Sequence, residues 1–99
     1  MRRSHLSALT ALAVLMAGAR PAEAAPTCSE QSVTARGDPS QFEVLAKAKA
    51  RGNWRAKVRA MPTLGASYAD FNKAQGADYS CSLRDGRHVC TAVGRPCRD

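Results

Sequence analysis

The chain has 99 residues and a formal net charge of +7, from 15 Lys and Arg against 8 Asp and Glu, and it carries four cysteines. This length excludes a multidomain protein. It also excludes a large apolar core, because small chains bury little of their unfolded surface, only about 60% of it for a chain of about 60 residues. We therefore expect one small domain that depends on disulfide bonds for its stability.

Residues 1–24 have the features of a secretory signal peptide. Met1-Arg2-Arg3 is a cationic start, residues 6–18 are largely apolar, and Ala22-Glu23-Ala24 is a small-residue cleavage site. The apolar run is shorter than the about 20 residues that cross a bilayer, and no stop-transfer segment follows it. The sequence predicts cleavage after Ala24, export to the periplasm or the medium, a mature domain of residues 25–99, and no transmembrane segment after cleavage.

The start of the mature domain is expected to be irregular, and a long helix is expected to follow it. Residues 25–37 are rich in Pro, Ser and Thr, so they read as an arm that Cys28 anchors. Good helix formers then predict a helix from Pro39 to about Met61, with Asp38 as its N-cap and Pro39 at its first position. Pro62 ends this helix.

One apolar row predicts the buried face of the long helix. Its members recur at spacings of four and three: Ala46, Ala50, Trp54, Val58 and Met61. Gly52-Asn53 interrupts the helical composition at a cost of about 1 kcal/mol, but the row keeps its phase across the interruption. We therefore expect one continuous helix.

A second, shorter helix is predicted from Leu64 or Ala66 to Gln75, with Gly76 as the residue that ends it. Leu64, Tyr68 and Phe71 fall on one face of this helix. We expect that face to pack on Trp54 and its row.

A β-hairpin is predicted at the C-terminal end of the chain. Asp85-Gly86 is a two-residue turn signal, because both residues tolerate the positive φ angles of a type I′ turn. Folding there places Cys81 opposite Cys90 at a position without backbone hydrogen bonds, where the Cα atoms are close enough for a disulfide. The same side of the hairpin is expected to contribute to the core through Tyr79, Leu83 and Ala92.

The hairpin register favours a Cys81–Cys90 disulfide, which leaves Cys28–Cys97 by elimination. An irregular strand would instead allow Cys90–Cys97 with Cys28–Cys81, and nothing local favours the third arrangement. The predicted fold class is α+β: a long helix, a short helix and a C-terminal disulfide-bridged hairpin in one small domain.

Residues 43–98 contain several short motifs, each present once: Asn53-Trp54-Arg55-Ala56-Lys57-Val58-Arg59-Ala60, Leu64-Gly65, Tyr68-Ala69-Asp70-Phe71, Ala74, Cys81, Cys90 and Gly94-Arg95-Pro96-Cys97. Together they resemble small secreted, disulfide-containing bacterial proteins of unassigned function. The resemblance implies one domain and exported disulfides, and it implies no activity.

The residues that could support chemistry are few. His88 is the one histidine left after cleavage, and a zinc site of His88 with Cys81, Cys90 and Cys97 lacks the C-x2-C spacing of zinc ligand pairs. Four exported cysteines leave no free thiol for nucleophilic catalysis, and the carboxylates are scattered along the chain. The sequence therefore predicts no catalytic site, no cofactor and no metal, so the protein is not expected to be an enzyme.

Charge is the remaining functional signal. Removing residues 1–24 leaves a net charge of +5, and four cations recur every four residues on the long helix: Lys47, Arg51, Arg55 and Arg59. A solvated face explains such a row equally well. The functional interpretation is a binding protein whose cationic helix face contacts an anionic lipid, a cell-wall polyanion or an acidic protein. Nucleic acid suits the charge but not the compartment.

The alternative from another class is a small enzyme inhibitor or accessory protein. Its contact would be the hairpin tip, Arg84-Asp85-Gly86-Arg87. Polyanion binding would weaken steeply with salt, whereas a contact at the tip would depend on Arg84 or Arg87.

Overall fold

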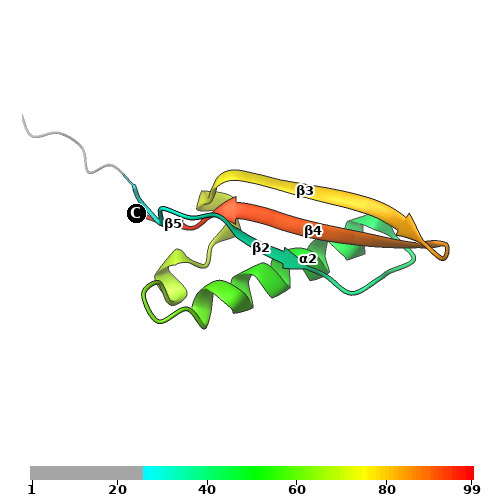
Figure 1. The fold of residues 1–99 in the computed structure, drawn as a ribbon, viewed down its shortest axis with the longest axis horizontal. Helices are drawn as coiled ribbons and strands as arrows, with labels where there is room; N and C mark the ends of the chain where they lie inside the picture. Colours follow the sequence, from blue (N-terminus) through cyan, green and yellow to red (C-terminus); the bar gives the residue numbers. More distant parts are fainter. Residues whose placement is uncertain (1–25) are drawn as a thin grey trace, which may run out of the picture.

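The computed structural model describes residues 26–99, in which one long helix covers one face of a three-stranded antiparallel sheet (Figure 1). The central strand is β4 (Arg87–Arg95), with β2 (Val33–Arg36) on one side and β3 (Gln75–Arg84) on the other. A second sheet pairs β1 (Thr27–Cys28) with β5 (Cys97–Arg98). The fold class α+β is confirmed.

The helical elements lie between β2 and β3 in the chain. They are the α-helix α2 (Glu43–Arg59) and two short 3-10 helices, η1 (Ala66–Tyr68) and η2 (Phe71–Lys73). Within residues 26–99 no helix has the length and apolar character needed to cross a membrane. The expected signal peptide, residues 1–24, lies outside the described residues.

The predicted hairpin and its register are confirmed. Asp85 and Gly86 have φ angles of 53° and 76°, as a type I′ turn requires. The turn places Arg84 opposite Arg87, and three pairs further from the turn Cys81 lies opposite Cys90. The local chemistry of two residues therefore fixes the pairing of the two longest strands.

Both disulfides form as the hairpin register favoured. Cys81–Cys90 bridges β3 and β4 with a Cα–Cα distance of 4.0 Å, and Cys28–Cys97 joins β1 to β5 across 69 positions of sequence. The alternative pairing of Cys90 with Cys97 is therefore excluded. Two disulfides are consistent with an oxidising compartment outside the cytoplasm.

The N-terminal arm is more regular than the sequence analysis expected. Residues 33–36 form β2, in which Val33 and Ala35 are buried while Thr34 and Arg36 are exposed. This alternation has the period of a strand, and β2 pairs with the far end of β4, from Val33 opposite Gly94 to Arg36 opposite Thr91. The prediction of an irregular arm was wrong for these four residues and for Thr27 and Cys28, which form β1.

The start of the long helix also needs correction. The helix begins at Glu43 with Phe42 at its N-cap, so Asp38 does not cap it and Pro39 is not its first residue. Instead Ser40 pairs with His88 through two backbone hydrogen bonds of 2.7 and 2.9 Å. Residues 38–41 thus continue beside β4, because pairing with the sheet satisfies backbone groups that a helix start would leave open.

The buried face of α2 is the predicted apolar row. Ala46, Ala50, Trp54 and Val58 are all 0% exposed, and Met61 packs at the edge of the core. The helix runs unbroken through Gly52-Asn53, as expected. The row packs on the inner sides of β2 and β4, so the core lies between one helix and two strands.

The bounds of the second helical segment differ from the prediction. Ala69 and Asp70 separate η1 from η2, and Gln75 and Gly76 already belong to β3. Gly76 has a φ of 65° where the register of β3 shifts, so its positive φ serves a strand irregularity and not a helix end.

The predicted packing of this segment is nevertheless present. Phe71 is buried with its ring edge-on to Trp54 at 5.0 Å between centroids, and Leu64 and Tyr68 pack against the core. Leu83, which was expected to join the core, is 66% exposed, because α2 packs mainly on β2 and β4.

Two glycines give a matched test of the packing of α2. A Cβ on Gly37 would lie 2.5 Å from the backbone nitrogen of Ala50, whereas a Cβ on Gly52 would meet nothing within 4 Å. We expect Gly37→Ala to lower the free energy of unfolding by about 1–3 kcal/mol, and Gly52→Ala to raise it by about 0.5–1 kcal/mol. Urea unfolding of both variants measures this, and equal stability of Gly37→Ala and wild type would contradict the close approach.

Candidate functional site

The four predicted cations follow one another along α2, and the first two of them contact Tyr79 of β3. Each follows a buried residue of the apolar row by one position, and four residues advance the helix by about 400°, so the row winds around the helix. Lys47 and Arg51 are half-buried, while Arg55 and Arg59 are exposed. The cations therefore do not form one uniform face.

The first two cations already have partners. The Lys47 ammonium lies 3.8 Å from the carboxylate of Glu43 and 5.7 Å from the centre of the Tyr79 ring. Arg51 Nη1 donates a hydrogen bond of 3.2 Å to the hydroxyl of Tyr79. Tyr79 thus anchors the cationic row to β3, a contact that the sequence analysis did not anticipate.

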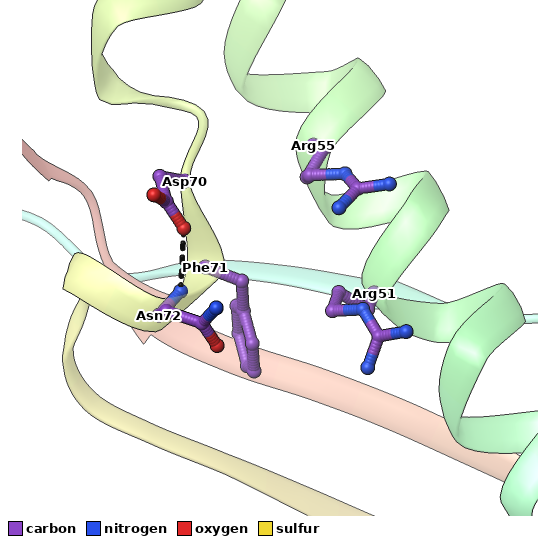
Figure 2. A pocket seen from close by; sticks show the side chains of 5 residues that line it. All are labelled: Arg51, Arg55, Asp70, Phe71 and Asn72. Carbon is purple, nitrogen blue, oxygen red and sulfur yellow. Dashed lines mark hydrogen bonds between the residues drawn. The ribbon is translucent and has the colours of Figure 1, made fainter.

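Arg51 and Arg55 also line a hollow of about 260 Å³ between α2 and η2. Figure 2 shows the two arginines on successive turns of α2, with Asp70 and Asn72 on the opposite side of the hollow. The Phe71 ring lies between Asn72 and Arg51. Asp70 Oδ1 accepts a hydrogen bond of 3.0 Å from the backbone nitrogen of Asn72, which fixes the turn of η2. We call this place the arginine hollow.

The arginine hollow has an excess of hydrogen-bond donors. Within residues 26–99 the ion pairs are Glu43–Lys47 and Lys73–Asp99, so no carboxylate described there lies within 4.0 Å of either guanidinium. Guanidinium groups match the planar or tetrahedral oxygens of carboxylates and phosphates, often with two bonds at once. The hollow can therefore accept a single anionic group.

The opposite side of α2 uses its polar residues for structure. Asn53 donates 2.8 Å to the carbonyl of Arg36, Lys57 donates 2.8 Å to that of Thr34, and Lys49 donates 3.3 Å to that of Pro39. These carbonyls lie along the outer edge of β2 and the segment that follows it. Residue spacing does not indicate that the helix cations divide into these two groups.

Lys73, in η2, is paired with the side chain of the last residue, Asp99. Lys73 Nζ lies 2.6 Å from the Asp99 carboxylate, and this hydrogen bond, with the attraction between the two charges, raises the pKa of Lys73 above its usual value. Because the pair is exposed, it contributes little to stability. Lys73 follows Asn72, which lines the arginine hollow, but its ammonium group is already paired with Asp99.

The hairpin tip carries its cations at the end of the molecule where α2 begins (Figure 1). Arg84 and Arg87 lie opposite each other and are exposed. A second hollow of about 220 Å³ lies beside Arg87, and its lining includes Phe42, Leu45 and Lys49. The tip thus combines positive charge with exposed apolar side chains.

The cysteines and His88 serve structure. All four cysteines are in disulfides, so none is a thiolate that could bind zinc, and His88 lies in β4 opposite Leu83 as the hairpin register predicts. The part of the chain from residue 26 onward contains no cluster of three or more His, Cys, Asp or Glu side chains that could hold a metal.

Comparisons with known proteins supply no relative. No protein-family model, no curated protein and no solved structure matches this chain. The resemblance to small secreted bacterial proteins stays a prediction, and the function has to be argued from the geometry of the chain itself.

Proposed function

We propose that the protein is an exported, non-enzymatic binding protein whose cationic helix face holds an anionic component of the cell envelope. The observation that supports this most is the arginine hollow, where Arg51 and Arg55 line one recess without a carboxylate of residues 26–99 within 4.0 Å. The two disulfides support an exported location, periplasmic or secreted.

The ligand is expected to be a phosphate or carboxylate group displayed on a larger polyanion, such as an anionic lipid surface, a cell-wall polyanion or an acidic protein. Each cation near an anionic lipid surface contributes about 1 kcal/mol. A row of four cations therefore binds a single anionic group weakly. It binds more strongly to a surface that presents many such groups, because several contacts form at once. Arg59, which is exposed and lies one helical turn beyond Arg55, extends the contact beyond the hollow.

Neutralising the hollow is expected to weaken binding to anionic vesicles. In the double variant, Arg51→Gln with Arg55→Gln, we expect the free energy of binding to weaken by about 2 kcal/mol, which is about thirtyfold in affinity. The affinity should also depend less steeply on salt concentration. Stability should change by less than about 1 kcal/mol, because losing the Arg51–Tyr79 hydrogen bond is offset by relieving repulsion between the arginines. Vesicle co-sedimentation at several salt concentrations measures the affinity.

The matched control is Lys49→Gln with Lys57→Gln, which removes the same charge from the opposite side of α2. We expect this control to keep most of the affinity. If both double variants bind equally well, or if the wild type binds no anionic surface at low salt, the row is only a solvated face.

The second candidate is an enzyme inhibitor or accessory protein that contacts its target through Arg84 and Arg87. What favours it is the second hollow, where Arg87 lies beside the exposed side chains of Phe42 and Leu45. For this function Arg84→Gln with Arg87→Gln would abolish binding, while the variants of the arginine hollow would leave it intact.

A further inference from the structure

The main sheet has two edge strands, β2 and β3, and other parts of the chain cover only one of these edges. The outer edge of β2 is covered, because Lys57 and Asn53 of α2 donate hydrogen bonds to the carbonyls of Thr34 and Arg36. The other edge is β3, and no strand within residues 26–99 pairs with its outer side. An uncovered strand edge is a ready template for pairing with another strand.

The open edge is long and regular. β3 keeps one register with β4 from Asp78 to Arg84, beyond the irregularity at Gly76. Edge strands that avoid pairing usually carry Pro, Lys or a bulge in their middle, and this seven-residue stretch has none of them. The disulfide at Cys81 further fixes the strand to β4.

The turn determines which backbone groups point outward. A two-residue turn makes Arg84 and Arg87 a hydrogen-bonded pair, so every second residue back from Arg84 bonds to β4. The residues between them, Tyr79, Cys81 and Leu83, therefore direct their N–H and C=O groups to the outer side. In agreement with this, the Tyr79 N–H donates 2.8 Å to the side chain of Asp78 and not to a strand.

We propose that a second copy of this chain pairs with this edge, β3 antiparallel to β3, with Cys81 of one copy opposite Cys81 of the other. This register places each Asp78 opposite Arg84 of the other copy, where the charges complement each other twice. It also places each Tyr79 opposite Leu83 of the other copy. Leu83, exposed in the single chain, then gains an aromatic neighbour.

The other symmetric registers are less complementary. Centring the pair on Ser80 would place Arg84 opposite Gly76, inside the irregular part of β3. Centring it on Ser82 would place Arg84 opposite Ser80 and bring the Asp85 turn residue against Tyr79. Registers shifted by one residue fail, because they would set outward-pointing groups against residues that already bond to β4.

The pairing closes the assembly at two copies. The two-fold axis puts both helices on the same face of one sheet, whose strand order is β2-β4-β3-β3-β4-β2. In the single chain α2 packs mainly on β2 and β4 (Figure 1). In the proposed pair the two helices therefore lie on either side of the paired β3 strands. The edges that remain in the combined main sheet are the two β2 edges, which α2 covers, so among the described residues this sheet offers no further open edge.

A charge swap tests the proposed register. Asp78→Arg and Arg84→Asp should each weaken the wild-type dimer about tenfold, because each sets like charges opposite each other twice. An equimolar mixture of the two variants should restore the dimer, since both cross-strand pairs become attractive again. Arg36→Asp, which makes the same charge change on β2, is the matched control and should leave the dimer unchanged.

Sedimentation equilibrium of the mature chain with intact disulfides, from about 10 µM to about 1 mM, provides the readout. A wild type that stays monomeric over this range, or a variant mixture no more dimeric than its components, would overturn the proposal. Amide hydrogen exchange adds a check that does not depend on any variant: protection of Tyr79, Cys81 and Leu83 should rise with concentration. Protection of Ser80 and Ser82 should not, because they already bond to β4, and the reverse pattern would also overturn it.

Discussion

Replacing Trp54 with alanine is expected to lower the free energy of unfolding by about 3–5 kcal/mol. Trp54 is fully buried in the middle of α2, its ring meets the edge of Phe71 at 5.0 Å, and its Nε1 donates 2.9 Å to the carbonyl of Val33. A domain of this size has a total stability of about 5 kcal/mol. The variant should therefore be largely unfolded near body temperature, as thermal unfolding followed by circular dichroism would show.

Two control variants separate the causes of this loss. Trp54→Phe keeps an aromatic ring but leaves the Val33 carbonyl without its donor, and we expect a loss of about 1–3 kcal/mol. Phe42→Ala removes an aromatic ring that is 60% exposed and should change stability by less than about 0.5 kcal/mol. A Trp54→Ala variant as stable as Phe42→Ala would show that the core is not organised around Trp54.

Removing the Cys28–Cys97 disulfide is expected to be the second large effect. The loop it closes spans 69 positions, against 9 for Cys81–Cys90, and loop-closure entropy grows with loop length. On the chain-entropy model the long bridge contributes about 4.4 kcal/mol and the short one about 2.7 kcal/mol. The long bridge also holds β1 against β5, a pairing of two residues on each side that would not persist alone.

Urea unfolding of Cys28→Ser with Cys97→Ser, compared with Cys81→Ser with Cys90→Ser, measures the two contributions. We expect the first pair of substitutions to lower the unfolding midpoint more. A larger loss from the hairpin pair would mean that the disulfide supports the β3–β4 geometry directly, beyond limiting the unfolded chain.

The parts of the fold that the sequence predicts are those with local causes. Asp85-Gly86 specifies the hairpin within two residues, and the register then follows to Cys81 and Cys90 by counting. The apolar row of α2 is likewise readable, because its period is a property of the helix itself. Gly52 did not break the helix, because Ala50 and Trp54 on either side of it remain buried in the same core.

The parts that the sequence did not predict depend on distant residues. Nothing near Arg36 indicates that it pairs with Thr91, so the local sequence predicts an irregular arm where β2 forms. Asp38 and Pro39 form a good local helix start, yet the bridge from Ser40 to His88 takes precedence over it. In both cases β4 supplies backbone partners that a local reading of the chain does not include.

The candidate site shows the same limit. Spacing alone predicts Lys47, Arg51, Arg55 and Arg59 as a row along one helix, and all four lie on α2, where the row winds around the helix. Spacing could not indicate that Tyr79 engages the first two cations, or that η2 completes a hollow around Arg51 and Arg55. These contacts arise from strand and turn residues more than 14 positions away in the chain.

The most direct test of the proposed function is to locate a bound anion. Two-dimensional 1H–15N spectra of the mature protein, recorded during titration with inorganic pyrophosphate at low salt, report on the Nε–H groups of the arginines and on the Asn72 side-chain amide. We predict saturable shifts at Arg51, Arg55 and Asn72 that disappear at about 1 M salt, where screening acts over about 3 Å. Shifts confined to Arg84 and Arg87, or spread evenly over all arginines, would contradict an anion site in the arginine hollow.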